Sequence, residues 1–473
     1  MPQPVRLRRS IWGLESLGPW DPYSLAYAKA VDAMQQLPAS NELSWEFQAG
    51  IHGRLCQHQT WFFLPWHRMY ILWFERIVQA QVAKQDGAPA DWALPYWDWQ
   101  ANRVIPPAFR ERSLPDGGDN PLFVEQRNPG INDGAAMRPA VVDSTAADNQ
   151  PAFTGGAASG FGFGGGDTHG PSHFDGGQTG LIEGQPHNNV HRTIGGIMGT
   201  ALSSRDPIFW LHHAQVDRLW EKWLASGGGR ANPNASGWLG QTYDFVKPDG
   251  SAVTQTPAEV RSTTDLGYRY EDQPAPVAVP LAAIIPELAD ATVLRLSGVA
   301  GPGGEPKELG ASGPVQLGAG ATTESIALDQ DESAGLERLA VPDTGPRSVA
   351  LVLDDIEPQD PATPSYEVYL NVPEKIESGH HGSRHFVGFL EFFGADHSHG
   401  EGEGHGHGLK RVFDITSLVH QLEQKGVWDP AKVEVSFVPA SVLEDARTGA
   451  PLPPPEMDEP PSVKVGSVRV VSE

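Results

Sequence analysis

Histidine residues gather in two short stretches of this 473-residue chain. Two of them, His187 and His191, stand four residues apart in HNNVH, so on a helix both imidazoles would project from one face, where two ligands can meet one ion. A single buried histidine is usually a hydrogen-bonded core residue, but several together among Trp, Phe and Leu need compensating partners. The sequence therefore predicts a metal site from two groups, namely His52, His58 and His67, and His187, His191, His212 and His213.

The ligand types narrow the choice of metal. Imidazole ligands suit copper, zinc, iron or nickel, and a site without thiolate or carboxylate ligands favours copper or zinc. The spacing of the histidines does not choose between these two metals. One carboxylate, Asp217, follows His213 by a single helical turn, so it would either orient an imidazole or form an ion pair at the surface near Arg218.

The apolar pattern places the first group of histidines in a helical region. Apolar residues recur at helical spacing between about residues 20 and 99, and a helix running on from Pro65 would carry His67 on the same face as core residues such as Phe74. This face would direct an imidazole into the interior of the fold.

The second group also lies on predicted helices. Helical spacing returns at 186–195 and again after Asp206, which suits an N-cap, with Pro207 as the first helical residue. Residues 106–180 separate the two groups and are rich in Gly, Pro, Asn and Asp. Irregular segments of this length inside a domain are usually functional or disordered.

The composition changes past the middle of the chain. Residues 271–290 are rich in Pro and Ala without a clear period, so we predict a domain boundary there. The remainder, 281–473, holds short β-rich runs between turn residues and one short helix near 417–424. We therefore predict an α+β multidomain fold, with a mainly α-helical domain at 1–280 followed by an antiparallel β-sandwich domain.

A low-complexity segment interrupts the second domain. Residues 394–408 alternate histidine with Gly, Ser and Glu, which is typical of a solvated loop. Transient capture of copper is the functional alternative, and it raises a copper-binding or storage module as a rival function. The histidines concerned are His397, His399, His405 and His407.

The charge and cysteine content exclude several classes of protein. A formal net charge of -25 repels polyanions, so we expect no nucleic acid and no anionic membrane as partner. The one cysteine, Cys56, cannot form an internal disulfide. The first residues lack the apolar core of a signal peptide and no later stretch is long enough for a membrane span, so a cytoplasmic location is expected.

Two longer strings connect these histidines with a known family. IHGRLCQHQTWFFLPWHRMYILWFE resembles the copper A signature of tyrosinases, and HNNVHRTIGGIMGTALSSRDPIFWLHHAQVDRLW resembles their copper B signature. LPYWDW at 94–99 and LGYRY at 266–270 agree as well, so the resemblance spans roughly residues 5–271. The chain is thereby identified as a member of the type-3 copper family, which includes tyrosinases, catechol oxidases and polyphenol oxidases.

The resemblance implies a dinuclear copper centre inside a four-helix bundle, with O2 as co-substrate. Adjacent helical residues point about a hundred degrees apart, so His212 is not expected to share an ion with its neighbour. The implied ligands are His52, His58 and His67 for copper A, and His187, His191 and His213 for copper B.

Further roles follow from the same resemblance. Cys56, two residues before His58, implies a covalent thioether to that ring, as in fungal and molluscan members; its alternative is a small buried hydrophobic residue. Glu183 and Asn188 would hold the water that takes a phenol proton, although Glu183 could instead be a charge at a helix N-terminus. Arg192 would lie at the site mouth and favour acidic phenols, or be an exposed helical arginine.

The implied function is O2-dependent oxidation of phenols or o-diphenols to o-quinones. The later β-rich runs resemble the C-terminal region of plant polyphenol oxidases, so we expect a lid that keeps the enzyme latent; a domain that only stabilises the core or an oligomer is the alternative. A haemocyanin-like carrier of O2 is the main rival function. The sequence leaves open the phenol, hydroxylation of monophenols and assembly into a homo-oligomer.

Overall fold

The computed structural model describes most of the chain. We call residues 5–273 the helical part and residues 307–472 the sheet part. The described residues are 5–14, 18–156, 161–273, 307–329, 348–360, 363–372, 383–395, 408–429, 431–454 and 460–472.

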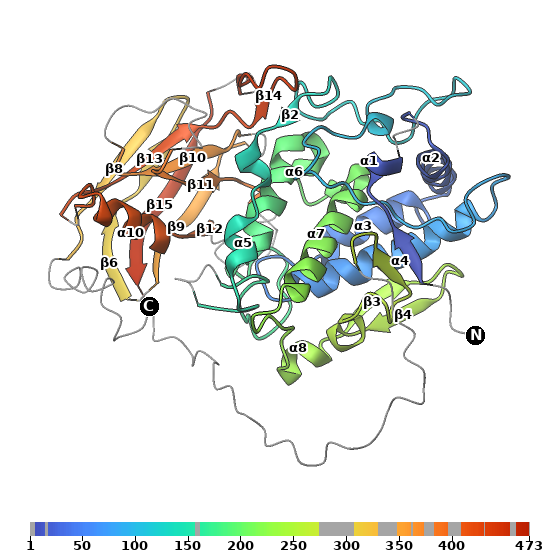
Figure 1. Ribbon diagram of the computed structural model, residues 1–473, viewed down its shortest axis with the longest axis horizontal. Coiled ribbons are helices and arrows are strands. Elements are labelled where there is room, and N and C mark those ends of the chain that lie inside the picture. The colour runs from blue at the N-terminus through green and yellow to red at the C-terminus, as the bar shows by residue number, and fades with distance from the viewer. Residues whose placement is uncertain are drawn as a thin grey trace, which may run out of the picture.

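Four longer helices organise the helical part (Figure 1). Asp21 caps the first by accepting from the backbone N–H groups of Tyr23 and Ser24, and Ser44 caps the second by accepting from that of Phe47. The third and fourth pack against each other and are buried along most of their length. These helices are α2 (Pro22–Gln35), α3 (Trp45–Leu55), α4 (Phe63–Val82) and α7 (Ile208–Ala225).

Shorter elements complete the helical part. The strands are β1 (Arg6–Arg8), β2 (Ala136–Met137), β3 (Tyr243–Val246), β4 (Ala252–Gln255) and β5 (Tyr268–Tyr270). The helices are α1 (Ile11–Leu14), α5 (Thr145–Asn149), α6 (Asn189–Ile194) and α8 (Ser236–Gly240). Short helical turns are η2 (Pro107–Phe109), η3 (Pro139–Val142), η5 (Glu183–Asn188), η6 (Gly196–Gly199), η7 (Ser203–Arg205) and η8 (Pro257–Val260).

Two antiparallel sheets form the sheet part. One has the strand order β11-β10-β13-β8, and the other has the order β12-β9-β15-β6 with β7 paired to β15. Apolar residues of both sheets share one buried core, because side chains alternate between the two faces of each strand. The elements are β6 (Lys307–Ser312), β7 (Val315–Leu317), β8 (Thr322–Ile326), β9 (Val349–Pro358), β10 (Tyr366–Leu370), β11 (Phe386–Leu390), β12 (Leu409–Asp414), α10 (Thr416–Gln424), β13 (Val433–Pro439), β14 (Leu443–Glu444) and β15 (Val463–Ser472).

The two parts meet along a seam. Strand β14 pairs with β2 of the helical part, and Glu444 forms an ion pair with Arg103. Phe389, Phe393 and Leu443 of the sheet part are buried in the apolar core of the helical part. A helical core followed by a sheet domain is thus confirmed, whereas the predicted boundary near residue 280 and the β-rich run at 291–299 lie outside the described residues.

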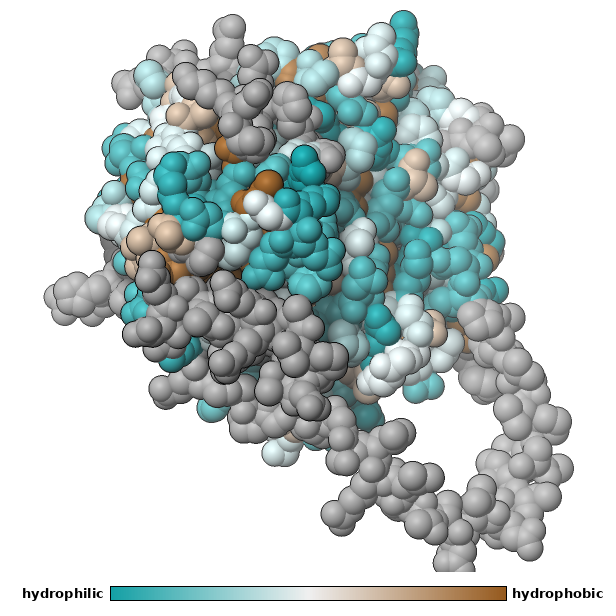
Figure 2. Space-filling view, turned by 60° about the vertical axis from the view of Figure 1, so that its left-hand side comes forward, coloured by the Kyte–Doolittle hydropathy of each residue, from teal (hydrophilic) through white to brown (hydrophobic). Residues whose placement is uncertain are grey.

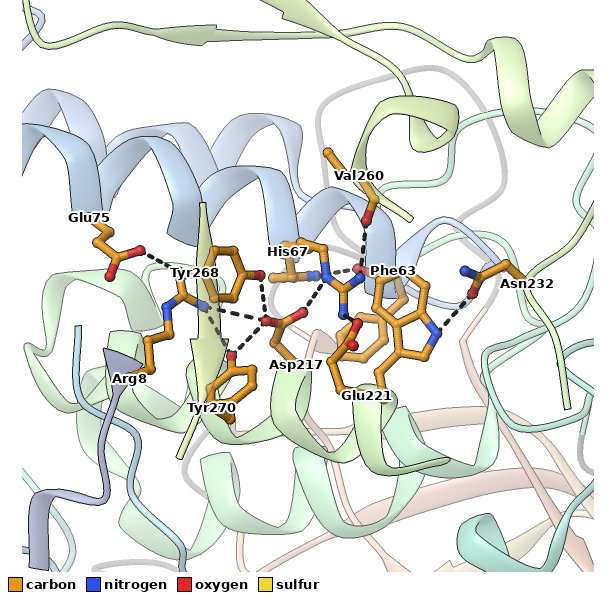
Figure 3. A network of polar contacts seen from close by, with 12 residues as sticks. Arg8, Phe63, His67, Glu75, Asp217, Glu221, Asn232, Val260, Tyr268 and Tyr270 are labelled. Carbon is orange, nitrogen blue, oxygen red and sulfur yellow. Dashed lines mark hydrogen bonds and ion pairs between the residues drawn. The ribbon is translucent and has the colours of Figure 1, made fainter. Parts of the chain in front are cut away.

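A buried charge network joins the chain ends of the helical part to α4 and α7 (Figure 3). Asp217 of α7 accepts hydrogen bonds from Arg68 at 2.5 Å, from Arg8 at 3.3 Å, and from the hydroxyls of Tyr268 and Tyr270 at 2.7 and 2.6 Å. Only 4% of Asp217 is exposed. The predicted surface ion pair of Asp217 is therefore wrong, because four donors from three segments surround this carboxylate.

The described surface is mainly polar. Hydrophilic residues dominate the described part of the face in Figure 2. The larger apolar side chains that remain exposed in the described ranges, Val5, Leu55, Leu202 and Val427, are scattered along the sequence. No helix among the described residues is both long and apolar enough to cross a membrane.

Candidate metal centre

Two buried clusters of histidine lie in the middle of the helical part. We call His52, His58 and His67 cluster A, and His187, His191 and His213 cluster B. In each, one potential ligand atom per residue lies within 4.8 Å of every other. The rings come from α3, the turn after it and α4 for cluster A, and from η5, α6 and α7 for cluster B.

Cluster B has the geometry of a ligand set. The Nε2 atoms of His187 and His191 both lie 3.3 Å from Nε2 of His213. The opposite ring nitrogens are held in place: Nδ1 of His187 lies 2.8 Å from Oδ1 of Asn188, and Nδ1 of His191 lies 2.8 Å from the carbonyl of Met198. Metal-binding histidines are commonly oriented by such a second hydrogen bond.

Cluster A is oriented in the same way. Nδ1 of His52 lies 2.7 Å from the carbonyl of Ala201, and Nδ1 of His67 lies 2.8 Å from that of Phe63. The third ring, His58, stacks on Phe174 with 4.1 Å between ring centroids. Two of the three rings are therefore directed by backbone carbonyls and the third by an aromatic neighbour.

The two clusters are adjacent. The rings of His67 and His213 stack with centroids 4.3 Å apart, and those of His58 and His187 are 5.8 Å apart. The two clusters therefore lie against each other, as the two ligand sets of a dinuclear centre must.

Burial keeps these imidazoles neutral. It lowers the pKa of His187 to about 3 and holds the pKa values of His58, His67 and His213 well below the ordinary range, with neighbouring rings adding to the shift for these three. Within the described residues, both ring nitrogens of His58 and Nε2 of His67 are buried without a hydrogen-bond partner. Neutral rings with such nitrogens fit a soft or borderline metal ion.

His212 lies closer to cluster B than helical geometry predicts. Its ligand atom falls within the same 4.8 Å limit as those of cluster B, and its ring stacks near His187 with centroids 5.1 Å apart. Nδ1 of His212 accepts a hydrogen bond of 3.1 Å from Nε1 of Trp99. The interaction with Trp99 gives this ring a partner outside the cluster.

Comparison with known proteins identifies the family of the chain. A family model described as the common central domain of tyrosinase matches residues 29–151 and 132–226, and a domain of unknown function (DUF7868) matches residues 306–448. A tyrosinase from Hahella sp. (strain CCB-MM4) is 29% identical over 461 residues, covering 88% of this chain and 92% of the relative. The chain belongs to the type-3 copper family. Members of this family use two copper ions with O2.

Other relatives of this type-3 copper protein come from plants. A chloroplastic polyphenol oxidase of Malus domestica is 26% identical over 461 residues, covering 88% of this chain and 73% of the relative. The structure of latent apple tyrosinase aligns over 100% of this chain and 98% of its own, with a TM-score of 0.63 and 21% identity. That likeness shows a common fold that includes the C-terminal sheets.

Cys56 lies buried beside a histidine that sequence reasoning missed. Its Sγ is 3.3 Å from Nδ1 of His173, and the same nitrogen is 2.9 Å from the Cys56 carbonyl. His173 belongs to the irregular segment that precedes η5. Its place in a Gly-rich run gave no periodic signal, so only the fold could bring it to Cys56.

Glu183 and Asn188 line the same region as cluster B. Glu183 is 1% exposed, accepts from the backbone N–H of Gln59 at 2.7 Å, and has its pKa raised to about 8 by burial. Asn188 stands between His187 and Glu391 of the sheet part, to which its Nδ2 donates at 3.0 Å. Glu183 is the first residue of η5, but its carboxyl group is buried and is not a solvent-exposed charge at a helix N-terminus.

Arg192 lies at the seam between the two parts. It is half-buried and donates to the carbonyls of Gly199 at 3.2 Å and Thr363 at 2.7 Å. A cavity of about 250 Å³ beside it is lined by residues that include Asn128 and Asp360. Arg192 was expected at the open mouth of the site. In this structure it lies instead where the helical part meets the sheet part.

A side chain of the sheet part covers the histidines. The ring of Phe393 stacks on His191 with centroids 4.4 Å apart and lies 5.5 Å from His58 and 5.7 Å from His187. The following Gly394 has a φ of +86° and packs against Phe174, where an added Cβ would lie 2.3 Å from its ring. Sequence reasoning predicted a lid but had no signal for the covering residue.

Proposed function

We propose that this copper oxidoreductase converts o-diphenols to o-quinones with O2 at a centre held by clusters A and B. One observation supports the proposal most: the Nε2 atoms of His187 and His191 each lie 3.3 Å from that of His213, beside a second buried cluster of three histidines. When bound, the copper pair supplies the redox chemistry with O2. The protein fixes the rings and excludes water.

We propose that Glu183 receives the proton of a monophenol through a water that it holds together with Asn188. Burial raises the pKa of Glu183 to about 8, which makes its ionised form a stronger base than an exposed glutamate. Its Oε2 atom is buried without a hydrogen-bond partner among the described residues. The proton would be held there while the phenolate oxygen turns to cluster B.

Arg192 is proposed to favour acidic or phenolate substrates once the sheet part moves. A guanidinium keeps its charge at every physiological pH, and two carbonyls already orient this one. Its separation from Thr363 would leave donors facing the site mouth.

The sheet part is proposed to keep the enzyme latent by placing Phe393 over His191. Such a plug acts at high effective concentration because it belongs to the same chain. The proposal includes the finer architecture, with α2, α3, α4 and α7 as a four-helix bundle and the two sheets as a sandwich. Cytoplasmic location and assembly into a homo-oligomer stay predictions.

Two rival functions are less well supported. A carrier of O2 in the manner of haemocyanin would not require Glu183 and Asn188, and the relatives named above are oxidases. A copper store depends on the His-rich segment, and residues 396–407 of it lie outside the described residues. Comparing copper stoichiometry before and after deletion of 394–408 separates storage from the main centre.

The deciding experiment is an aerobic assay of the copper-loaded full chain with a matched monophenol and o-diphenol. We expect quinone formation from the diphenol with consumption of O2. Reversible uptake of O2 without quinone would establish the carrier instead. The ratio of the two rates gives the subclass.

A further inference from the structure

Asn188 connects a proposed copper ligand to the sheet part. Its Oδ1 lies 2.8 Å from Nδ1 of His187, and its Nδ2 donates to Oε1 of Glu391 over 3.0 Å. The exposed fractions of His187, Asn188 and Glu391 are 0%, 3% and 1%. A buried chain of hydrogen bonds therefore runs from a carboxylate of the sheet part through an amide to an imidazole of cluster B.

The carboxylate end sets the direction of this chain. A carboxylate ion only accepts hydrogen bonds, so Glu391 requires the NH2 group of Asn188 to face it, and the amide oxygen then faces His187. That oxygen also only accepts, so Nδ1 of His187 must carry the ring proton. A neutral imidazole has one N–H, and Nε2 therefore keeps the lone pair that a metal needs.

Glu391 is itself held rigidly. Its Oε1 lies 2.7 Å from Nε of Arg411, and its Oε2 accepts from the backbone N–H of Phe393 at 2.7 Å. Arg411 also donates to the carbonyl of Phe393 at 3.1 Å. The ion pair thus contacts the backbone of Phe393 through both its N–H and its carbonyl, and it holds the carboxylate of Glu391 in place beside Asn188.

We propose that Glu391 is a positioning residue for cluster B, which orients the Asn188 amide and thereby fixes the tautomer of His187. This inference rests on the proposed role of His187 as a copper ligand. The sheet part then covers the centre and also supplies a group that the centre uses. Cluster A differs, because its oriented rings, His52 and His67, are bonded to carbonyls of the helical part.

The decisive variant is Glu391→Gln. The amide of glutamine has the size of the carboxylate but can present either an oxygen or an NH2 group to Asn188. The donor and acceptor order of the hydrogen bonds from residue 391 to His187 is then no longer fixed. Loss of an outer partner of a metal-binding histidine typically weakens metal binding about 10–100-fold. We expect a loss of that size for the copper of cluster B and none for that of cluster A.

Two variants of the full chain serve as controls. Glu444→Gln removes a carboxylate that also crosses the seam, where it pairs with Arg103 at 2.5 Å. Phe393→Ala removes the covering ring but leaves the carboxylate in place. Both should bind copper like the unaltered protein.

A rescue separates positioning from mere packing. In the double variant Glu391→Gln with Asn188→Asp, the new carboxylate accepts from Nδ1 of His187 without any direction from residue 391. Copper affinity at cluster B should return towards the original value. A structural role of Glu391 would not be repaired by this change.

Copper affinity is measured by competition of Cu(I) with a chromophoric chelator on protein prepared without metal. A second readout needs no copper: 15N-histidine spectra should show His187 protonated at Nδ1 in the unaltered chain and a mixture of tautomers in Glu391→Gln, with assignment from His187→Gln. Should Glu391→Gln not fold, Asn188→Leu breaks the same link from the helical part, with the same expected loss.

Three outcomes would overturn the inference. They are unchanged copper affinity and tautomer in folded Glu391→Gln, equal losses in Glu391→Gln and Glu444→Gln, and absence of rescue by the double variant. A copper content other than two per chain in the unaltered protein would instead contradict the proposed function.

Discussion

The two histidine clusters differ in what holds them. Cluster A is oriented from within the helical part, since His52 and His67 are bonded to backbone carbonyls and His58 lies on Phe174. Cluster B also depends on the sheet part, because Asn188 joins His187 to Glu391 and Phe393 lies on His191. One cluster is therefore fixed with the helices, and the other is where a second part of the chain can control access.

The strongest test of this comparison removes a ligand from cluster B. His213→Ala should leave one copper per chain instead of two and abolish phenol oxidation, because two imidazoles remain for that ion. Metal analysis and the oxidase assay measure both effects. His212→Ala is the matched control and should keep both coppers; loss of copper in this control, with retention in His213→Ala, would reverse the ligand assignment.

Removing the ring of Phe393, which covers His191, should test whether the sheet part controls access to cluster B. Phe393→Ala in the full chain should raise turnover of a bulky o-diphenol by about 10-fold or more, because an intramolecular plug of high effective concentration is lost. Copper content should not change. Phe389→Ala, which removes a buried ring packed 5.3 Å from Phe386, is the control for general loosening of the seam.

Cleavage or truncation within 271–290 is the coarser form of the same test. A folded, copper-replete enzyme whose activity does not rise after this treatment would contradict a lid. A rise in turnover at saturating copper supports it, because truncation also removes Glu391 and should weaken copper binding at cluster B.

Glu183 offers a selective perturbation near cluster B. Glu183→Gln should slow monophenol hydroxylation about 100-fold, as expected for loss of a general base, and affect o-diphenol oxidation far less. Steady-state rates on the paired substrates measure the split. Equal losses on both would indicate a structural role.

The same variant tests the pKa of Glu183 in the copper-free protein. Because the folded pKa is raised to about 8 from 4.5, the folded state binds this proton more tightly than the unfolded chain. Its contribution to stability is therefore complete below pH 4.5 and is lost as the pH rises to about 8. Glu183→Gln should remove that part of the decline, as chemical denaturation at several pH values will measure.

The next prediction concerns a covalent bond to His58 of cluster A. Cys56 should be bonded to His58 after exposure to copper and O2, since the thiol is buried two residues from that ring and no second cysteine exists. Intact mass should fall by about two hydrogens, with no titratable thiol. A fully reactive thiol in active enzyme would exclude the bond, and Cys56→Ser is the control for the mass.

Arg192 should give the smallest effect. Arg192→Ala should reduce the preference for acidic over neutral phenols by a few-fold, because a charge that solvent can reach contributes about 1 kcal/mol or less to such a pair. The ratio of kcat/KM for the two phenols measures it. An unchanged ratio would indicate that Arg192 has a structural role at the seam, where it donates to Gly199 and Thr363.

The local sequence pattern indicated many of the helices and strands of this protein. Helical spacing around His67 and the HNNVH string indicated which rings could share a face, and alternation in the later runs indicated strands such as β9 and β15. These signals are local because side-chain direction repeats with the backbone of each element. The histidine clusters and the sheet part followed from them.

Contacts between distant residues were decided only by the tertiary structure. Asn188 and Glu391 are 203 residues apart, and Cys56 and His173 are 117 apart. No periodicity records such pairs, since their meeting depends on how the two parts pack. The burial of Asp217 and the covering of His191 by Phe393 have the same origin: an isolated segment specifies which face is apolar, and the whole fold specifies what lies against it.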